Sequence, residues 1–167
     1  MPAAVPARLL IASSLLPVYQ LRSQPPPAPA SPWPPLGQAQ QTDSGGARLT
    51  VTVTKLTDPL LDSGAALLPA TRAVAVFVEI ANAGPATYDS SASGDFSVIA
   101  STGAVTPAFA PQGVCQTPLR DFENDIYAGG GGSGCIAFSV ATGARILAVR
   151  FSPHAASPGS RTWLVSP

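Results

Sequence analysis

Residues 48–56 read RLTVTVTKL, and apolar and polar side chains alternate through most of this segment. Leu49, Val51 and Val53 fall on one side of an extended chain, and the threonines between them fall on the other. Successive side chains of a β-strand point to opposite faces of the sheet, so this pattern predicts a strand with one buried face. The segment therefore indicates a sheet that packs on one side against an apolar core.

Similar short segments follow along the chain, separated by turn residues. Residues 72–82, RAVAVFVEIAN, place four aliphatic side chains on one face and predict a central strand. Five more segments are typical of strands: DFSVIAS (95–101), the run from Val105 to Phe109, GCIAFSV (134–140), RILAVRF (145–151) and RTWLV (161–165). Pro107 cannot donate to a ladder, which favours an edge position for its strand. About seven short strands predict an all-β, two-sheet immunoglobulin-like β-sandwich over residues 46–167.

The composition supports a single β-rich domain and excludes some partners. Among 167 residues there are 19 prolines and 15 glycines, too many for a helix-rich fold, and 46% of residues are hydrophobic. Only 11% are charged, with nine basic and nine acidic residues. Such a chain has no field that would hold a polyanion, so we expect no nucleic acid partner.

Two segments precede the predicted sandwich. In residues 1–22, Arg8 stands before an apolar run from Leu9 to Val18, the outline of a signal peptide; the alternative is a disordered or partly helical N-terminus. The run is about half of what a membrane span needs, so membrane association is expected only through this segment. Residues 23–45 are rich in proline and predict an extended linker, in which Trp33 is an exposed ring or a weak contact.

The chain contains two cysteines, Cys115 and Cys135, 20 positions apart. Neither has the CxxC spacing, the nearby histidine or the third thiol that a metal or redox site needs. An even cysteine count on a small β-rich chain favours a disulfide formed in an oxidising compartment. We therefore predict a Cys115–Cys135 bridge and an extracytoplasmic location, with a pair of buried thiols as the alternative.

Three patterns resemble binding or catalytic sites without completing one. Residues 129–134, GGGGSG, fit GxGxxG, but a strand follows where a phosphate site needs a helix, so a turn or bulge is favoured. Asp121, Glu123 and Asp125 alternate and could face a calcium ion, yet the glycine and closing glutamate of a calcium loop are missing. His154 is the only histidine and stands in a turn, where a solvated role is favoured over catalysis. We expect no catalytic residue, cofactor or metal.

The strand segments together resemble a known group of proteins. The run YAGGGGSGCIAFSVATGARILAVRF (127–151), following RLTVTVTKL, RAVAVFVEIANAG and DFSVIASTG, is similar to the immunoglobulin-like domain of uncharacterised actinobacterial secreted proteins and lipoproteins. The mycobacterial immunoprotective extracellular antigen is a structural relative of that family. The resemblance covers about residues 46–166 and implies an extracytoplasmic β-sandwich of undefined activity. Family members often have a lipid-modified cysteine near the start, which this sequence lacks.

These observations predict a non-enzymatic secreted or cell-surface module that meets another protein or a component of the cell envelope. The alternative is a carbohydrate-binding module of the envelope, because β-sandwiches often present exposed aromatic rings to sugars. Trp163, Tyr127 and Tyr88 are the candidate rings, although packing in the core or at its rim is favoured for each. The sequence does not identify the ligand or the oligomeric state.

Overall fold

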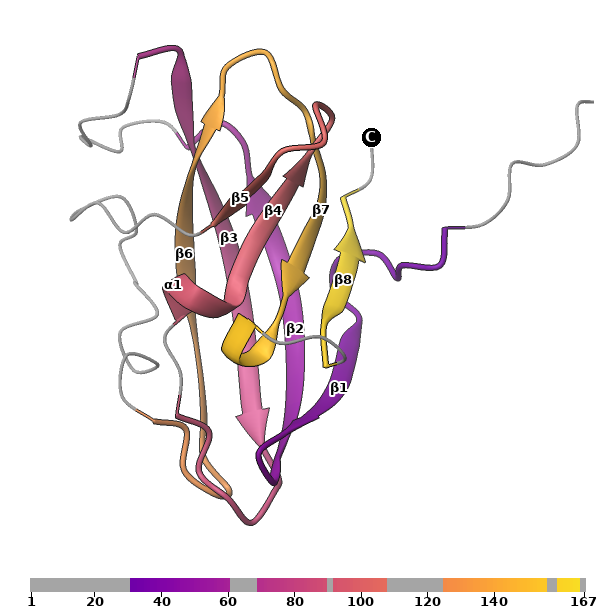
Figure 1. The fold of residues 1–167 in the computed structure, drawn as a ribbon, viewed down its shortest axis with the longest axis vertical. Helices are drawn as coiled ribbons and strands as arrows, with labels where there is room; N and C mark the ends of the chain where they lie inside the picture. Colours follow the sequence, from indigo (N-terminus) through magenta and orange to yellow (C-terminus); the bar gives the residue numbers. More distant parts are fainter. Residues whose placement is uncertain (1–30, 61–68, 90–91, 108–124, 156–158, 166–167) are drawn as a thin grey trace, which may run out of the picture. The chain divides into compact units, whose positions relative to one another are not determined.

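The computed structural model describes residues 31–60, 69–89, 92–107, 125–155 and 159–165, all within a compact unit that begins at Ser31. These residues form two antiparallel four-stranded sheets, and an immunoglobulin-like β-sandwich results (Figure 1). The predicted fold class is therefore confirmed. Helical structure within the described ranges is limited to the single turn α1 (Ala92–Asp95) and the 3₁₀ turn η2 (Pro153–Ala155).

The first sheet has the strand order β1-β2-β3-β6. Its strands are β1 (Ala39–Ser44), β2 (Ala47–Thr57), β3 (Thr71–Asn82) and β6 (Gly131–Ala141). The alternation seen in the sequence of β2 is confirmed, since Leu49, Val51 and Val53 have no exposed surface. A shift in the pairing of β2 with β3 after Val53 turns Leu56 inward, where it packs against the core.

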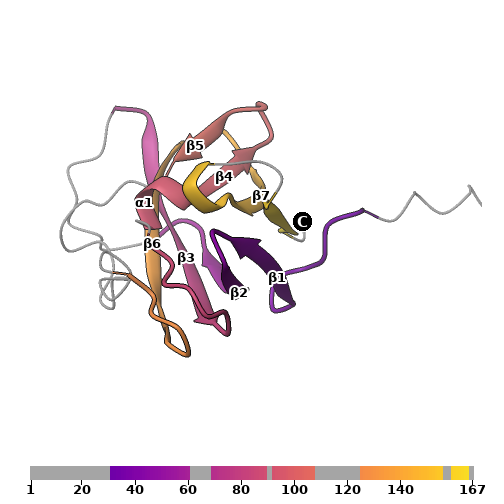
Figure 2. The ribbon, with the colours of Figure 1, turned by 60° about the horizontal axis from the view of Figure 1, so that its bottom comes forward.

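The second sheet has the order β5-β4-β7-β8 and lies across the core from the first (Figures 1 and 2). Its strands are β4 (Phe96–Ala100), β5 (Val105–Pro107), β7 (Ile146–Phe151) and β8 (Arg161–Leu164). A hairpin turn at Ser101–Gly103 joins β4 to β5 and is closed by the Gly103 amide, which donates to Ala100 O at 2.9 Å. As predicted, the short strand with Pro107 lies at a sheet edge.

The inward faces of both sheets form one hydrophobic core, as a sandwich requires. The largest side chains with less than 2% exposure are Trp163, Phe138, Phe151, Leu49, Val51, Val53, Val74, Val76, Val78, Val98, Val140 and Val149. Burial of each such aliphatic or aromatic side chain favours folding by about 1.5–3 kcal/mol. The ring of Phe151 contacts two other aromatic members of the core, with its centroid 4.8 Å from that of Phe96 and 6.3 Å from that of Tyr88.

One boundary predicted from sequence is wrong. Residues 23–45 were expected to be a linker, but β1 pairs along its whole length with β2, and Pro35 forms a bridge with Leu164 of β8. The sandwich therefore begins well before residue 46, and residues 1–30 lie outside the described ranges. AQQTDS, the sequence of β1, lacks the apolar alternation of a half-buried strand because mainly Thr42 turns inward.

Contacts between β1 and β8 join the two sheets along one side of the sandwich. Four side chains each bond a main-chain oxygen across the gap: Gln40 to Thr162, Thr42 to Gly159, Arg161 to Gln41 and Trp163 to Gln38, at 2.7–3.0 Å. These hydrogen bonds occupy main-chain oxygens at the edges of the two sheets, where another chain could otherwise pair. This side of the sandwich is consequently closed by the protein itself.

The glycine-rich run at 129–134 is also different from expectation. A turn or bulge was predicted, but β6 begins at Gly131, and Gly131–Gly134 pair with Val78–Ala81 of β3. A Cβ on Gly131 would stand 2.6 Å from Ile80 O, so glycine at this position permits close pairing. The turn itself is confined to the residues before Gly131.

Candidate binding surface

Three connections meet at the end of the first sheet where β3 finishes and β6 begins (Figure 1). They are the β1–β2 turn at Gly45–Gly46, the segment 83–89 after β3, and the segment 126–130 before β6. Tyr127 lies in the third of them with 66% of its surface exposed, the highest value among the exposed large hydrophobic side chains of the described residues. We call these three connections the loop tip.

Asn82, the last residue of β3, holds the loop tip together. It is 1% exposed, and its Oδ1 accepts hydrogen bonds from the Arg48 amide at 3.2 Å and the Gly84 amide at 2.9 Å. Its Nδ2 donates to Ala86 O at 2.7 Å and to Ile126 O at 2.9 Å. A buried amide whose donors and acceptor are all used fixes the main chain around it. One side chain thus connects β2 with the two segments 83–89 and 126–130.

Main-chain hydrogen bonds also fix the segment that contains Tyr127. Tyr88 and Ile126 exchange two hydrogen bonds at 2.8 and 2.9 Å, and the Gly130 amide donates to Tyr127 O at 2.9 Å. The main chain of Asn82 donates to Gly130 O and accepts from Gly129 N, both at 2.8 Å. Tyr127 therefore projects from a segment fixed at both of its ends.

Close packing of main chain at the loop tip requires glycine at position 84. A Cβ placed there would lie 2.2 Å from Arg48 N and 2.6 Å from Gly46 O, well inside any real contact distance. The role of Asn82 as a buried connector was missed, because a turn asparagine and a buried one have the same sequence signal.

The chemistry of the loop tip suits binding rather than reaction. Besides Tyr127, its exposed residues are small or apolar except for Thr87 and Asp89, and the ion pair between Arg48 and Asp43 at 3.8 Å is largely exposed. A rigid tyrosine offers a broad ring and a hydroxyl at little conformational cost, which is why such residues anchor protein interfaces.

The aromatic residues proposed for sugar binding do not form one platform. Trp163 has no exposed surface, and its Nε1 donates to Gln38 O at 2.7 Å inside the sandwich. Tyr88 is 3% exposed, and its hydroxyl donates to Asp95 Oδ2 at 2.6 Å. Of the three candidate rings only Tyr127 is exposed, so the suggested role of Trp163 and Tyr88 in carbohydrate binding is wrong. Trp33, the other tryptophan, is 38% exposed.

His154 lies close to an acid, but the arrangement is structural. The Asp95 carboxylate is 4% exposed and accepts the main-chain N–H of His154 at 2.9 Å, while the imidazole ring packs on Tyr88 with centroids 5.0 Å apart. A Ser–His–Asp mechanism needs the carboxylate on the ring itself and a hydroxyl on the opposite nitrogen. The nearby hydroxyls of Ser152 and Ser160 bond each other at 2.9 Å instead. Asp95 thus connects α1 with η2 and Tyr88.

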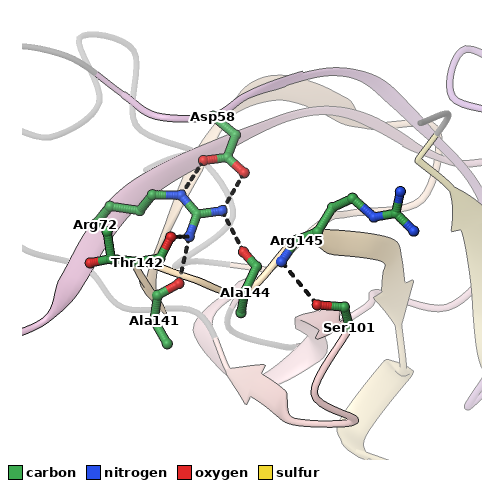
Figure 3. A network of polar contacts seen from close by, with 7 residues as sticks. All are labelled: Asp58, Arg72, Ser101, Ala141, Thr142, Ala144 and Arg145. Atoms are coloured by element: carbon green, nitrogen blue, oxygen red, sulfur yellow. Dashed lines mark hydrogen bonds and ion pairs between the residues drawn. The ribbon is translucent and has the colours of Figure 1, made fainter.

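A second polar cluster surrounds Arg72 at the other end of β3 (Figure 3). Its guanidinium binds Asp58 through two parallel bonds at 2.5 and 2.6 Å and donates to the main-chain oxygens of Ala141, Thr142 and Ala144. The hydrogen bonds that Arg72 donates to the Asp58 carboxylate raise the pKa of Arg72 above its ordinary value, although partial burial opposes this. All five bonds stay within the chain, so the cluster fixes the β6–β7 turn and presents no free group to a ligand.

Several predicted positions lie partly or wholly outside the described residues. For the suggested calcium site, Asp125 is described but Asp121 and Glu123 are not, and the described residues contain no group of three metal-ligating side chains. For the predicted disulfide, Cys135 is 5% exposed in β6 and is not a free thiol, whereas Cys115 is not among the described residues. The Cys115–Cys135 pairing therefore stays a prediction.

Comparison with known proteins supports the fold. No protein-family model matches the sequence, and no curated protein matches it. The crystal structure of MPT63, a secreted protein from Mycobacterium tuberculosis, is similar, with a TM-score of 0.53 and 18% sequence identity over 80% of this chain and 99% of MPT63. This agrees, at the level of the fold, with the predicted relation to a mycobacterial extracellular antigen. Among the described residues we find no helix long and apolar enough to cross a bilayer.

Proposed function

We propose that this chain is a non-enzymatic module, secreted or displayed at the cell surface, that binds a protein or a component of the cell envelope through the loop tip. The observation behind this proposal is the 66% exposure of Tyr127 on a support held by the buried Asn82. A large exposed ring on a rigid base loses little entropy on binding, which favours a role as an interface anchor. Ala128 and Gly129, which follow Tyr127, have small side chains that leave the ring accessible.

The proposed location rests on separate observations. The signal-like pattern of residues 1–22 and the predicted disulfide both favour an oxidising, extracytoplasmic compartment. MPT63, which has the same fold, is a secreted protein. Fractionation of the native host followed by N-terminal sequencing tests this part, and recovery of the unprocessed chain in the cytosol would contradict it.

A photo-crosslinking experiment tests the binding surface. We would replace Tyr127 by benzoylphenylalanine and irradiate the full-length protein with isolated cell envelopes and with the culture filtrate of the host. The matched control carries the same group at Val105, which is 51% exposed on the edge strand β5 of the other sheet. We expect a discrete adduct from position 127 and none of that size from position 105.

A competition experiment tests whether the adduct formed at position 127 depends on the Tyr127 ring. Excess unmodified protein should abolish the adduct from position 127, whereas excess of the Tyr127→Ala variant should compete poorly because it lacks the anchoring ring. A hot-spot tyrosine lost to alanine typically weakens binding by about 30-fold or more. Equal competition by both proteins, or the same adducts from both positions, would overturn the loop tip as the binding surface.

A further inference from the structure

One edge of the first sheet is exposed where β6 begins. Among the described residues β6 pairs with β3 alone, so it is an edge strand of its sheet (Figure 1). Gly131 and Ser133 are exposed, whereas the strand is buried from Gly134 to Phe138. The accessible part of this edge is therefore residues 131–133, which we call the β6 edge segment.

The register of β6 shows which main-chain groups of this segment point outward. At the two ends of β6, Gly130 and Thr142 each form a main-chain hydrogen bond to the β3 chain, to Asn82 N at 2.8 Å and to Ala70 O at 2.9 Å. In an antiparallel ladder, residues that bond a given neighbour alternate with residues that do not. Even-numbered residues of β6 thus bond β3, and the odd-numbered residues 131 and 133 point their N–H and C=O groups away from it.

The other three edge strands of the sandwich are closed or short. β1 and β8 are connected by side-chain hydrogen bonds, and β5 has three residues and contains Pro107. Lysine, proline or a bulge commonly protects an exposed edge. The β6 edge segment has the sequence GGS and regular pairing with β3, so it contains none of these features. Its outward main-chain groups can therefore pair with an incoming extended chain.

The stretches of chain that adjoin the β6 edge segment are acidic. Residues 79–89 and 125–134 contain Glu79, Asp89 and Asp125 and no lysine, arginine or histidine. Glu79 is exposed and forms no ion pair within the part of the chain that the structure describes. Complementary charge steers a partner to such a surface and like charge disfavours it. The charges around this edge therefore favour a basic partner.

From these observations we infer that the β6 edge segment binds an extended segment of another protein, which adds a strand to the first sheet and contains lysine or arginine. A residue of the incoming strand that pairs with Ser133 would share a face of the sheet with Ser133 and Glu79. A long cationic side chain at that position reaches across the small serine toward Glu79, two strand spacings or ~10 Å away. The inference rests on the proposed function, because Tyr127 lies four positions before Gly131 and would contact the same partner.

The same charges disfavour the pairing of two copies of this chain through β6. A second copy would bring a second set of the same three carboxylates to the interface, and its adjoining stretches would supply no cation. Like charges brought together at an interface oppose association. The partner is therefore a different, basic chain.

Titration of the full-length protein with a short synthetic peptide tests the inference. The probe is acetylated VKVKV amide, whose two lysines lie on one face when the chain is extended. We expect the amide resonances of Gly131 and Ser133 to shift at millimolar peptide, and that of Val105 in the edge strand β5 to stay unchanged. The peptide VEVEV should bind about tenfold more weakly or not at all. No shift at Gly131 and Ser133, or equal binding of the two peptides, would overturn the inference.

Two matched pairs of variants locate the binding. Ser133→Pro removes an outward N–H that β3 does not use, a change that an edge strand tolerates, whereas Ser133→Ala keeps this N–H. We expect the Kd for VKVKV to rise by about tenfold in the proline variant alone. Glu79→Gln should raise it by about threefold, and Asp43→Asn, on β1 at the other edge of the sheet, should not. If Ser133→Pro does not fold, the second pair decides, and equal binding by its two members would overturn the inference.

Two further measurements separate this inference from the proposed function. If the adduct from position 127 forms equally in Ser133→Pro, the loop tip stands as the binding surface and the β6 edge segment is overturned. If VKVKV binds as expected but position 127 gives no adduct, the β6 edge segment is supported and the loop tip is overturned. Sedimentation of the free protein should show a monomer, and a dimer that Ser133→Pro cannot form would overturn the inference in favour of a second copy.

Discussion

At the scale of single residues, the loop tip depends on a glycine that cannot be enlarged. Alanine at position 84 would place its Cβ 2.2 Å from Arg48 N, so main chain has to move. We expect Gly84→Ala to lower the free energy of unfolding by about 1–3 kcal/mol. Gly143→Ala is the matched control, since a Cβ there meets nothing within 4 Å, and it should change stability by less than about 0.5 kcal/mol. Urea denaturation of both variants measures the difference; equal effects would contradict the close approach at Gly84.

Asn82 is the second residue on which the loop tip depends. Asn82→Ala removes four side-chain hydrogen bonds and leaves buried main-chain groups unpaired, which should cost about 2–4 kcal/mol of unfolding free energy. Thr54→Ala, which removes one exposed bond to Phe77 O, is the control and should cost less than about 1 kcal/mol. Amide exchange should rise at Tyr127–Gly130 in Asn82→Ala alone. Unaltered exchange there would show that the segment is held by other contacts.

At the scale of elements, the Arg72 cluster joins β3 to two connections of the chain. Lysine keeps the charge but cannot bind Asp58 with two parallel bonds while reaching three main-chain oxygens. We expect Arg72→Lys to lower the free energy of unfolding by about 1–2 kcal/mol. Arg145→Lys is the matched control, because the hydrogen bond it makes to Ser101 Oγ comes from its main-chain N–H (Figure 3). Equal losses in the two variants, measured by denaturant unfolding, would count against the geometric role of Arg72.

β1 is the edge strand whose removal should destabilise the sandwich most. A variant beginning at residue 46 lacks β1 and the Gln38 oxygen that accepts from Trp163, leaving a buried indole N–H unpaired. We expect it to be less stable than a variant beginning at residue 31 by an amount on the order of 3 kcal/mol or more. Thermal unfolding compares the two. Equal midpoints would restore the boundary predicted from sequence.

The contrast between β1 and the other strands shows what the sequence can and cannot predict. Seven strands were predicted because their inward side chains are apolar at every second position, as in β2. β1 has the sequence AQQTDS and is held by polar contacts with β8, which depend on residues more than 100 positions away. Local patterns contain no signal for such contacts. The same limit applies to Asn82, whose partners come from β2 and from the segment before β6.

At the scale of the whole molecule, the edge strands on the two sides of the sandwich differ in composition and in the contacts that they make. The β1–β8 side is closed by four bonds from side chains to main chain. On the other side, β5 is a strand of three residues that contains Pro107, and β6 is a strand of eleven residues without a charged side chain. The loop tip lies at the end of the first sheet where β3 finishes and β6 begins.

The predicted disulfide would stabilise this arrangement by restricting the unfolded chain. Closing a loop between Cys115 and Cys135, 20 positions apart, corresponds to ~3 kcal/mol. We therefore expect a reductant to lower the free energy of unfolding by about that amount, and a Cys115→Ser/Cys135→Ser variant to show the lower value with or without reductant. The loss should fall mainly on β6, because Cys135 is its fifth residue and pairs with the central strand β3 at Phe77. Mass spectrometry after alkylation under native conditions checks the bond itself: two alkylated cysteines in the oxidised protein would remove both the bridge and its contribution.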